Sequence, residues 1–139
     1  MQYTEGPIGV IVESAASFYA TVVWGSADGT VDLPAASGAG NIAGVLLPKA
    51  NASSYSANDS ANLAIEPGRI VKFNKVAGYT VTRGEYLAIF NTDGALAPVS
   101  HWSAASGTNL DIIGKATESC ASDDTVGYMM ITHGSYQEE

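Results

Sequence analysis

The amino-acid sequence predicts an all-β fold: a single compact β-sandwich or a partly open β-barrel with an extended N-terminal arm. Two observations indicate this class. The apolar segments are short, rich in Val, Ile, Tyr, Phe and Thr, and separated by clusters of Gly, Pro, Asn and Asp. No segment repeats apolar residues at the spacing of a helix face. A chain of 139 residues suits one domain with its own core, and its single cysteine excludes an intramolecular disulfide.

The predicted strands follow one another at short intervals along the chain. They cover residues 9–13, 17–24, 42–47, 64–66, 70–75, 85–90, 112–118 and 126–132. Residues 51–62 are predicted as a surface loop, because their Ser and Asn side chains compete for backbone hydrogen bonds. Residues 34–40 and 100–109 are predicted as loops because few of their side chains are hydrophobic. The dipeptide Asp93-Gly94 between two apolar runs predicts a β-hairpin.

The two ends of the chain are predicted to lie outside the β domain, which covers residues 9–134. Residues 1–8 lack a strand pattern and contain Tyr3 and Pro7, so we expect an arm that becomes ordered on docking. Residues 135–139 are predicted as an acidic C-terminal tail.

The charge of the chain argues against several classes of partner. Six basic and 14 acidic residues give a formal net charge of −8, which repels the phosphates of nucleic acids. No apolar run reaches the length of about 18 residues that crosses a bilayer, and the first residues carry no positive charge of a secretory signal. We therefore expect a soluble protein made in a cytoplasm, with neither nucleic acid nor membrane as partner.

Charged residues are also scarce. They make up 14% of the chain, against about 25% in a typical soluble domain. Such a surface is either built from small polar residues or covered by neighbouring molecules.

The inventory of reactive side chains predicts no enzyme. His101 and His133 are the two side chains that could serve as general bases, and neither stands in a catalytic motif; we expect His133 at a solvated strand end. Two histidines and Cys120 lack the spacing of a zinc site, and Asp123-Asp124 lacks the pattern of a calcium loop. We expect an inert Cys120, and we expect neither a metal nor a cofactor.

Four of the six basic residues are concentrated in one stretch of the chain. They are Arg69, Lys72, Lys75 and Arg83, and no acidic residue lies among them. One interpretation is a solvated strand face whose lysines protect an exposed sheet edge. The other is a docking patch for an acidic protein surface.

The order of segments over residues 41–132 resembles the capsid cement, or head decoration, proteins of tailed bacteriophages. The resemblance consists of a series of short phrases in a fixed order. They are Ile42 with Gly44-Val45, the turn Glu66-Pro67-Gly68, Thr80–Leu87, Asp93–Pro98, Ile113–Ala116 and a closing strand at 126–132.

This resemblance implies a structural virion protein without catalytic residues. Such proteins bind the outside of the major capsid protein lattice as trimers or smaller units and stabilise the mature head, and a homotrimer is the form expected here. The implied location is the outer surface of the virion, after synthesis in the host cytoplasm. The residues that we consider candidates for docking to the capsid are Tyr3, Thr4, Arg69, Lys72, Lys75 and Arg83.

Two other functions remain open at this point. A carbohydrate-binding or adhesion module could use Trp24, Trp102 and the seven tyrosines as stacking surfaces, although Trp24 closes an apolar run and is predicted to lie in the core. A small hydrolase would need His101 or His133 beside a nucleophile in a pocket.

Overall fold

The computed structural model describes residues 8–101 and 109–137, and it confirms the all-β class. In this part of the chain, twelve strands and one short 3-10 helix follow one another. They are β1 (Ile8–Val12), β2 (Ala16–Ser17), β3 (Thr21–Trp24), β4 (Thr30–Asp32), β5 (Ile42–Leu46), β6 (Ser54–Tyr55), β7 (Ser60–Ala64), β8 (Ile70–Asn74), β9 (Tyr86–Ile89), β10 (Leu96–Pro98), η1 (Val99–His101), β11 (Asn109–Ala116) and β12 (Val126–Gln137).

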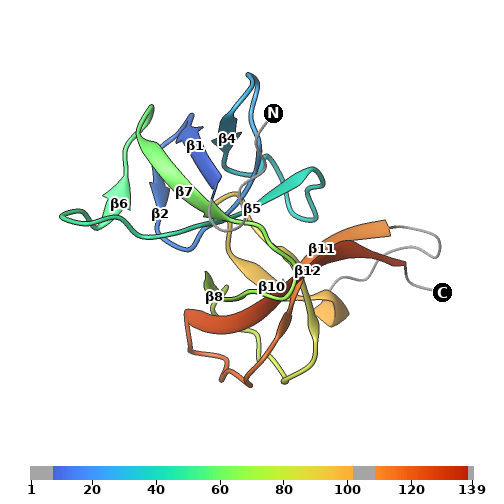
Figure 1. Cartoon of the computed structure of the whole chain (residues 1–139). Coiled ribbons are helices and arrows are strands. Elements are labelled where there is room, and N and C mark those ends of the chain that lie inside the picture. The colour runs from blue at the N-terminus through green and yellow to red at the C-terminus, as the bar shows by residue number, and fades with distance from the viewer. Residues whose placement is uncertain (1–7, 102–108, 138–139) are drawn as a thin grey trace.

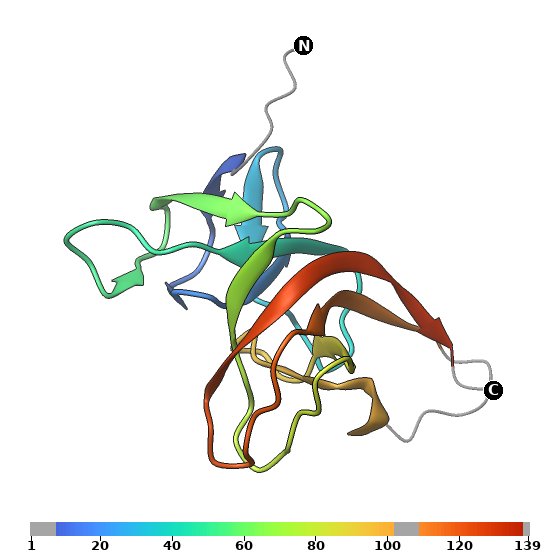
Figure 2. The same cartoon turned by 60° about the horizontal axis from the view of Figure 1, so that its bottom comes forward.

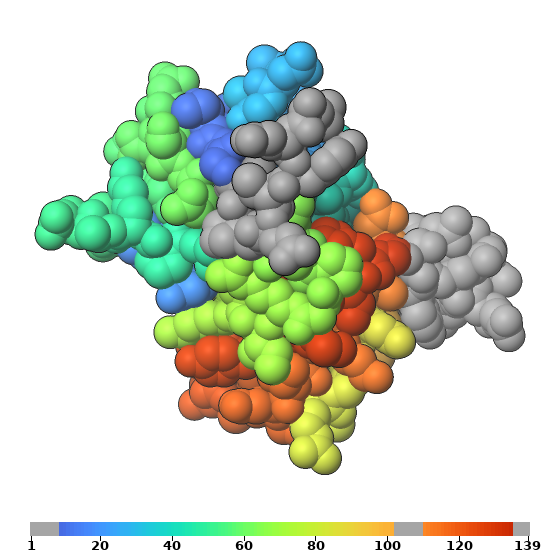
Figure 3. All heavy atoms as spheres, viewed as in Figure 1, coloured from blue at the N-terminus to red at the C-terminus, as the bar shows by residue number. Residues whose placement is uncertain are grey.

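The strands form a closed barrel and an open sheet. The barrel has the order β1-β4-β3-β5-β7, and the five-stranded sheet has the order β10-β9-β11-β12-β8. Figure 1 shows the barrel above the sheet, and Figure 2 shows β12 as a long curved ribbon across the sheet. A small pair joins β2, which lies between β1 and β3 in the chain, to β6, which projects from the barrel on the loop between β5 and β7. In the space-filling view of Figure 3, the barrel strands make up the upper part and β11 and β12 much of the lower part.

Each of the two parts has its own buried core. The barrel encloses the side chains Val10, Val12, Val22, Val31, Leu46, Tyr55 and Leu63. The sheet packs on the barrel through Phe73, Leu87, Ile89, Leu96, Ile113, Met129 and Ile131. Val45 of β5 and Ala64 of β7 are paired residues on adjacent barrel strands. Both belong to the core of the sheet, so the two parts of the protein meet at this pair.

The hairpin at Asp93-Gly94 is confirmed. Strand β9 pairs antiparallel with β10, and the Phe90 amide donates to the Ala95 carbonyl at 2.8 Å. Gly94 has a φ of 78°, a conformation that glycine adopts without steric cost. The predicted loop at 34–40 is also confirmed.

Four predictions in and beside the barrel are wrong. Residues 17–24 do not form one strand, because Tyr19 has a φ of 66° and separates β2 from β3. The predicted loop at 51–62 contains β6 and the start of β7, and of the strand predicted at 64–66 only Ala64 belongs to β7. Strand β4 is missing from the prediction, since Val31 is its sole apolar residue.

The two ends of the predicted domain also change. Ile8 belongs to β1 rather than to the arm, and residues 1–7 lie outside the described part of the chain. Strand β12 continues to Gln137, which pairs with Asn109. Residues 135–137 are therefore part of the sheet and not of a separate tail.

A matched pair of glycines tests the tight contact between β5 and β7. A Cβ atom on Gly44 would lie 2.4 Å from the Ala64 carbonyl oxygen, whereas one on Gly9 would meet no atom within 4 Å. We expect Gly44→Ala to lower the free energy of unfolding by about 1–3 kcal/mol, because the backbone of β7 must move. Gly9→Ala is expected to change it by less than about 0.5 kcal/mol in urea unfolding. Equal effects of the two substitutions would contradict this packing.

Candidate interaction surface

One face of the open sheet carries most of the exposed apolar surface. Among the described residues, seven large hydrophobic side chains are exposed, and five of them lie on β8, β9 and β12. With two lysines between them they form what we call the exposed sheet face: Ile70, Lys72, Tyr86, Lys115, Val126, Tyr128 and Met130.

The register of the strands places these side chains on the same side. Ile70 pairs with Met130, Met130 with Lys115, and Lys115 with Tyr86, so one row crosses four strands. In the next row Lys72 pairs with Tyr128. Directly opposite residues on neighbouring strands project to the same face. The alternate residues of the same strands, such as Phe73 and Met129, are fully buried in the core.

The same side of the sheet is covered toward β10. There Ala88, Val99, Leu110 and Ile112 form a small buried cluster beside helix η1. Toward β8 no element of the described chain takes over this cover, and Ile70 is 62% exposed. The exposed sheet face therefore lies on the same side of the sheet as the buried cluster near η1, but the described chain does not cover it.

The charges on this face are positive. The Lys115 Nζ atom lies 5.5 Å from the centroid of the Tyr86 ring, and the Lys72 Nζ atom lies 5.3 Å from that of Tyr19. These are cation–π distances, which orient the lysine heads without neutralising them. None of the seven residues of the face is acidic.

Two other basic residues have carboxylate partners. Lys49 lies 2.8 Å from Asp59, and the hydrogen bond to this ammonium is the largest cause of a lowered pKa at Asp59. Arg69, a docking candidate, lies 3.5 Å from Glu66 at the start of β8 and is half-exposed.

The remaining docking candidates do not form one patch. Lys72 is on the exposed sheet face, and Arg83 is exposed in the turn before β9. Tyr3 and Thr4 lie outside the described residues.

Lys75 is buried and cannot contact a partner, which corrects its place among the docking candidates. Its side chain is 3% exposed. The Nζ atom donates to the carbonyl oxygens of Val76 at 2.9 Å, Ser122 at 3.3 Å and Asp124 at 3.0 Å. An ammonium has three N–H donors, so these carbonyls satisfy it. Lys75 thereby fastens the turn between β11 and β12 to the end of β8.

Lys115, Tyr86, Tyr128 and Met130 were not among the residues predicted from the sequence. The signal for the last two was present, because residues 126–131 have large apolar side chains on both faces of the strand. An antiparallel sheet in water normally alternates apolar and polar residues. Lys115 and Tyr86 required the pairing of β11 with β9, which the sequence alone does not supply.

Trp24 is 40% exposed and is therefore not a core residue, contrary to the prediction. His133 is also placed differently. It lies inside β12, half-buried, with its Nε2 atom 2.8 Å from the Ile65 carbonyl oxygen, where the ring N–H donates. His101 packs against a ring, with its centroid 4.3 Å from that of Tyr79.

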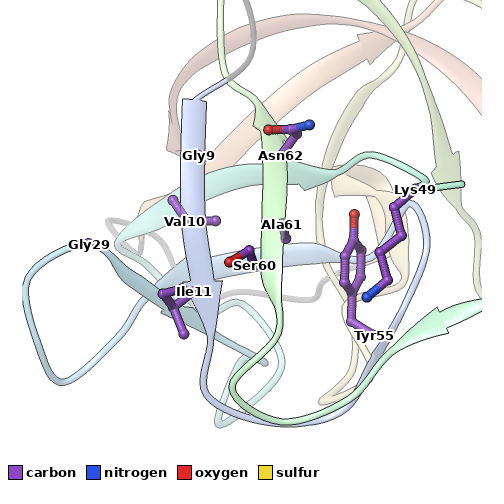
Figure 4. A pocket seen from close by; sticks show the side chains of 9 residues that line it. All are labelled: Gly9, Val10, Ile11, Gly29, Lys49, Tyr55, Ser60, Ala61 and Asn62. Carbon is purple, nitrogen blue, oxygen red and sulfur yellow. The ribbon is translucent and has the colours of Figure 1, made fainter.

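A pocket of about 320 Å³ lies on the barrel over the paired strands β1 and β7. Figure 4 shows Tyr55 and Lys49 at one side of it and the strands at the other. The Tyr55 hydroxyl donates to the Leu47 carbonyl, and burial raises the pKa of Tyr55. Lys49 stands 5.0 Å from the centroid of the Tyr55 ring. The Tyr55 hydroxyl and the Lys49 ammonium at the pocket thus have partners within the protein.

Burial, with the nearby Asp124 carboxylate as a smaller cause, raises the pKa of the Cys120 thiol. A raised pKa keeps the thiol protonated and weakly nucleophilic. Among the described residues, no three His, Cys, Asp or Glu side chains gather as a metal site would require. The same part of the chain contains no apolar helix of membrane-spanning length.

Comparison with solved structures finds chains of similar fold. No protein-family model and no curated protein sequence matches the chain. The N base of the head fiber gp8.5 in bacteriophage phi29 aligns with a TM-score of 0.56, over 96% of this chain and 98% of that chain. The two chains share a fold. Their sequence identity is 15%, and the alignment spans both the barrel and the sheet.

The role of Lys75 can be tested against Lys72, three residues away on the same stretch. We expect Lys75→Met to lower the free energy of unfolding by about 1–3 kcal/mol, because three carbonyl groups lose their donor. Lys72→Met, on the surface, is expected to change it by less than about 0.5 kcal/mol. Thermal and urea unfolding measure both variants, and a Lys75→Met protein as stable as the wild type would contradict the structural role.

Proposed function

We propose that this chain is a structural protein of a tailed-phage head, without catalytic activity, that binds the outside of the major capsid protein lattice. The observation that carries the proposal is the alignment with the phi29 head fiber base over nearly the whole of both chains. The resemblance of residues 41–132 to capsid cement proteins supports the same class of role independently of the structure.

The exposed sheet face also supports an assembled rather than a solitary protein. Exposed apolar patches on soluble proteins mark interaction sites. Tyrosine and methionine, which this face presents at positions 86, 128 and 130, are enriched in the cores of protein interfaces.

In this proposal the chain stabilises the mature head as a homotrimer through many modest contacts. When a trimer bridges several capsid subunits, the later contacts form within one assembly and so at a high effective concentration. If the trimer binds only to the expanded lattice, binding lowers the free energy of the expanded shell relative to every other state of the shell. Each copy needs to contribute little for the assembled lattice to resist opening.

Co-sedimentation with phage heads tests the proposal. Purified protein is mixed with expanded and with unexpanded shells of the phage that encodes it, and protein without shells is the control. We expect retention on expanded shells and a higher temperature of shell disruption, since the ligand binds one state preferentially. Absence of retention on both kinds of shell would contradict the proposal.

The exposed Trp24 supports a second candidate, a carbohydrate-binding or adhesion module of a phage or cell-surface assembly. An indole that is 40% exposed can stack against a sugar ring. In this case, titration with glycans is expected to quench the tryptophan fluorescence of the wild type and not that of Trp24→Leu. Equal quenching in both proteins would argue against a site at this residue.

A further inference from the structure

We propose that the exposed sheet face is the surface that contacts the shell, and that it binds an acidic protein surface with an apolar centre. This inference rests on the proposed function and adds to it the contact residues and the chemistry of the partner. The residues of the face come from four separate strands, β8, β9, β11 and β12.

The apolar part of the argument is the continuity of the patch. Ile70, Met130 and Tyr86 lie in one registered row, and Tyr128 lies in the next. Their exposed fractions range from 37% for Met130 to 62% for Ile70. Isolated exposed apolar residues are ordinary, whereas a contiguous set on one face of a sheet is a site that a partner covers.

The electrostatic part is the contrast between this face and the rest of the chain. The face contributes two positive charges, Lys72 and Lys115, and no negative one. Because the whole chain has a formal net charge of −8, the remainder has −10. A positive apolar face on a negative protein favours one orientation toward an acidic surface and disfavours the others.

The same charges argue against a second copy of the chain as a face-to-face occupant. A two-fold contact brings the same patch of both copies together, so lysines would face lysines across an apolar interface. Like charges in such a contact are unfavourable. An acidic partner surface neutralises both lysines instead.

The edge position of β8 argues for contact through side chains rather than through an added strand. Strand β8 is the last strand of the sheet, and its middle residue is Lys72. A lysine on an edge strand discourages pairing with a further strand. The partner is therefore expected to cover the face of the sheet and not to extend it.

The test uses matched exposed residues on the two parts of the protein. Met130 on the face and Ile11 on the barrel are 37% and 38% exposed, so each accepts a polar side chain with similar effect on folding. We expect Met130→Asp to weaken binding to expanded shells at least about tenfold, and Ile11→Asp to leave it unchanged. Tyr128→Ala, a substitution without new charge, is expected to act in the same direction. Thermal unfolding of each variant verifies that it folds.

The charge of the partner is tested with lysines. Lys72→Glu combined with Lys115→Glu is expected to abolish retention, whereas Lys49→Glu on the barrel is expected to have no effect. Raising the salt from about 0.05 M to about 0.5 M is expected to weaken wild-type binding, because salt screens the contact.

The outcomes separate this inference from the proposed function. If the wild type does not bind shells, the proposed function fails. If the wild type binds and the folded face variants bind equally well, the function stands and the assignment of the face is overturned. If Met130→Asp instead dissociates an oligomer of the free protein in sedimentation velocity and leaves shell binding intact, the occupant is a second copy, and the inference is overturned as well.

Discussion

In the described part of the chain, one face of the open sheet is packed on the barrel while much of the other face stays uncovered, and this difference shapes the molecule. The inner side chains of β8 and β12, among them Phe73 and Met129, pack on the barrel and are fully buried. The outer side chains of the same two strands, among them Ile70 and Tyr128, are large and apolar too. Helix η1 covers the outer side near β10, and the described chain leaves the rest open. All five strands of the sheet are paired and its inner face is packed, but part of its outer face has no cover from the described residues.

The sparse charge of the chain follows the same division. Lys49 and Arg69 have carboxylate partners, and Lys75 is buried and donates hydrogen bonds to three backbone carbonyl groups. Lys72 and Lys115 remain on the open face, where tyrosine rings hold them in place without removing their charge. A low density of charge is thus compatible with a directed interaction, because Lys72 and Lys115 lie where the apolar surface is, while Arg83 is exposed in the turn before β9.

The class of fold was predictable because turn residues and short β-branched runs report on strands directly, as the hairpin at Asp93-Gly94 demonstrates. The barrel was not predictable, because its short strands depend on pairing between segments far apart in the sequence. Strand β4 pairs with β1 and β3, and β7 pairs with β1 and β5. The site was half predictable. Clustering in sequence located Lys72, but it also selected Lys75, since the distinction between a buried and an exposed lysine depends on which carbonyl groups the fold brings near.

Covalent labelling of lysines on assembled heads tests the central claim most directly, because it reports contact in the unmodified protein. Acetylation of the free protein and of the protein bound to expanded shells is compared by mass spectrometry at Lys49, Lys72 and Lys115. The account predicts that Lys72 and Lys115 lose their reactivity on the shell while Lys49 keeps it. Protection of Lys49 with unchanged reactivity at Lys72 and Lys115 would contradict it.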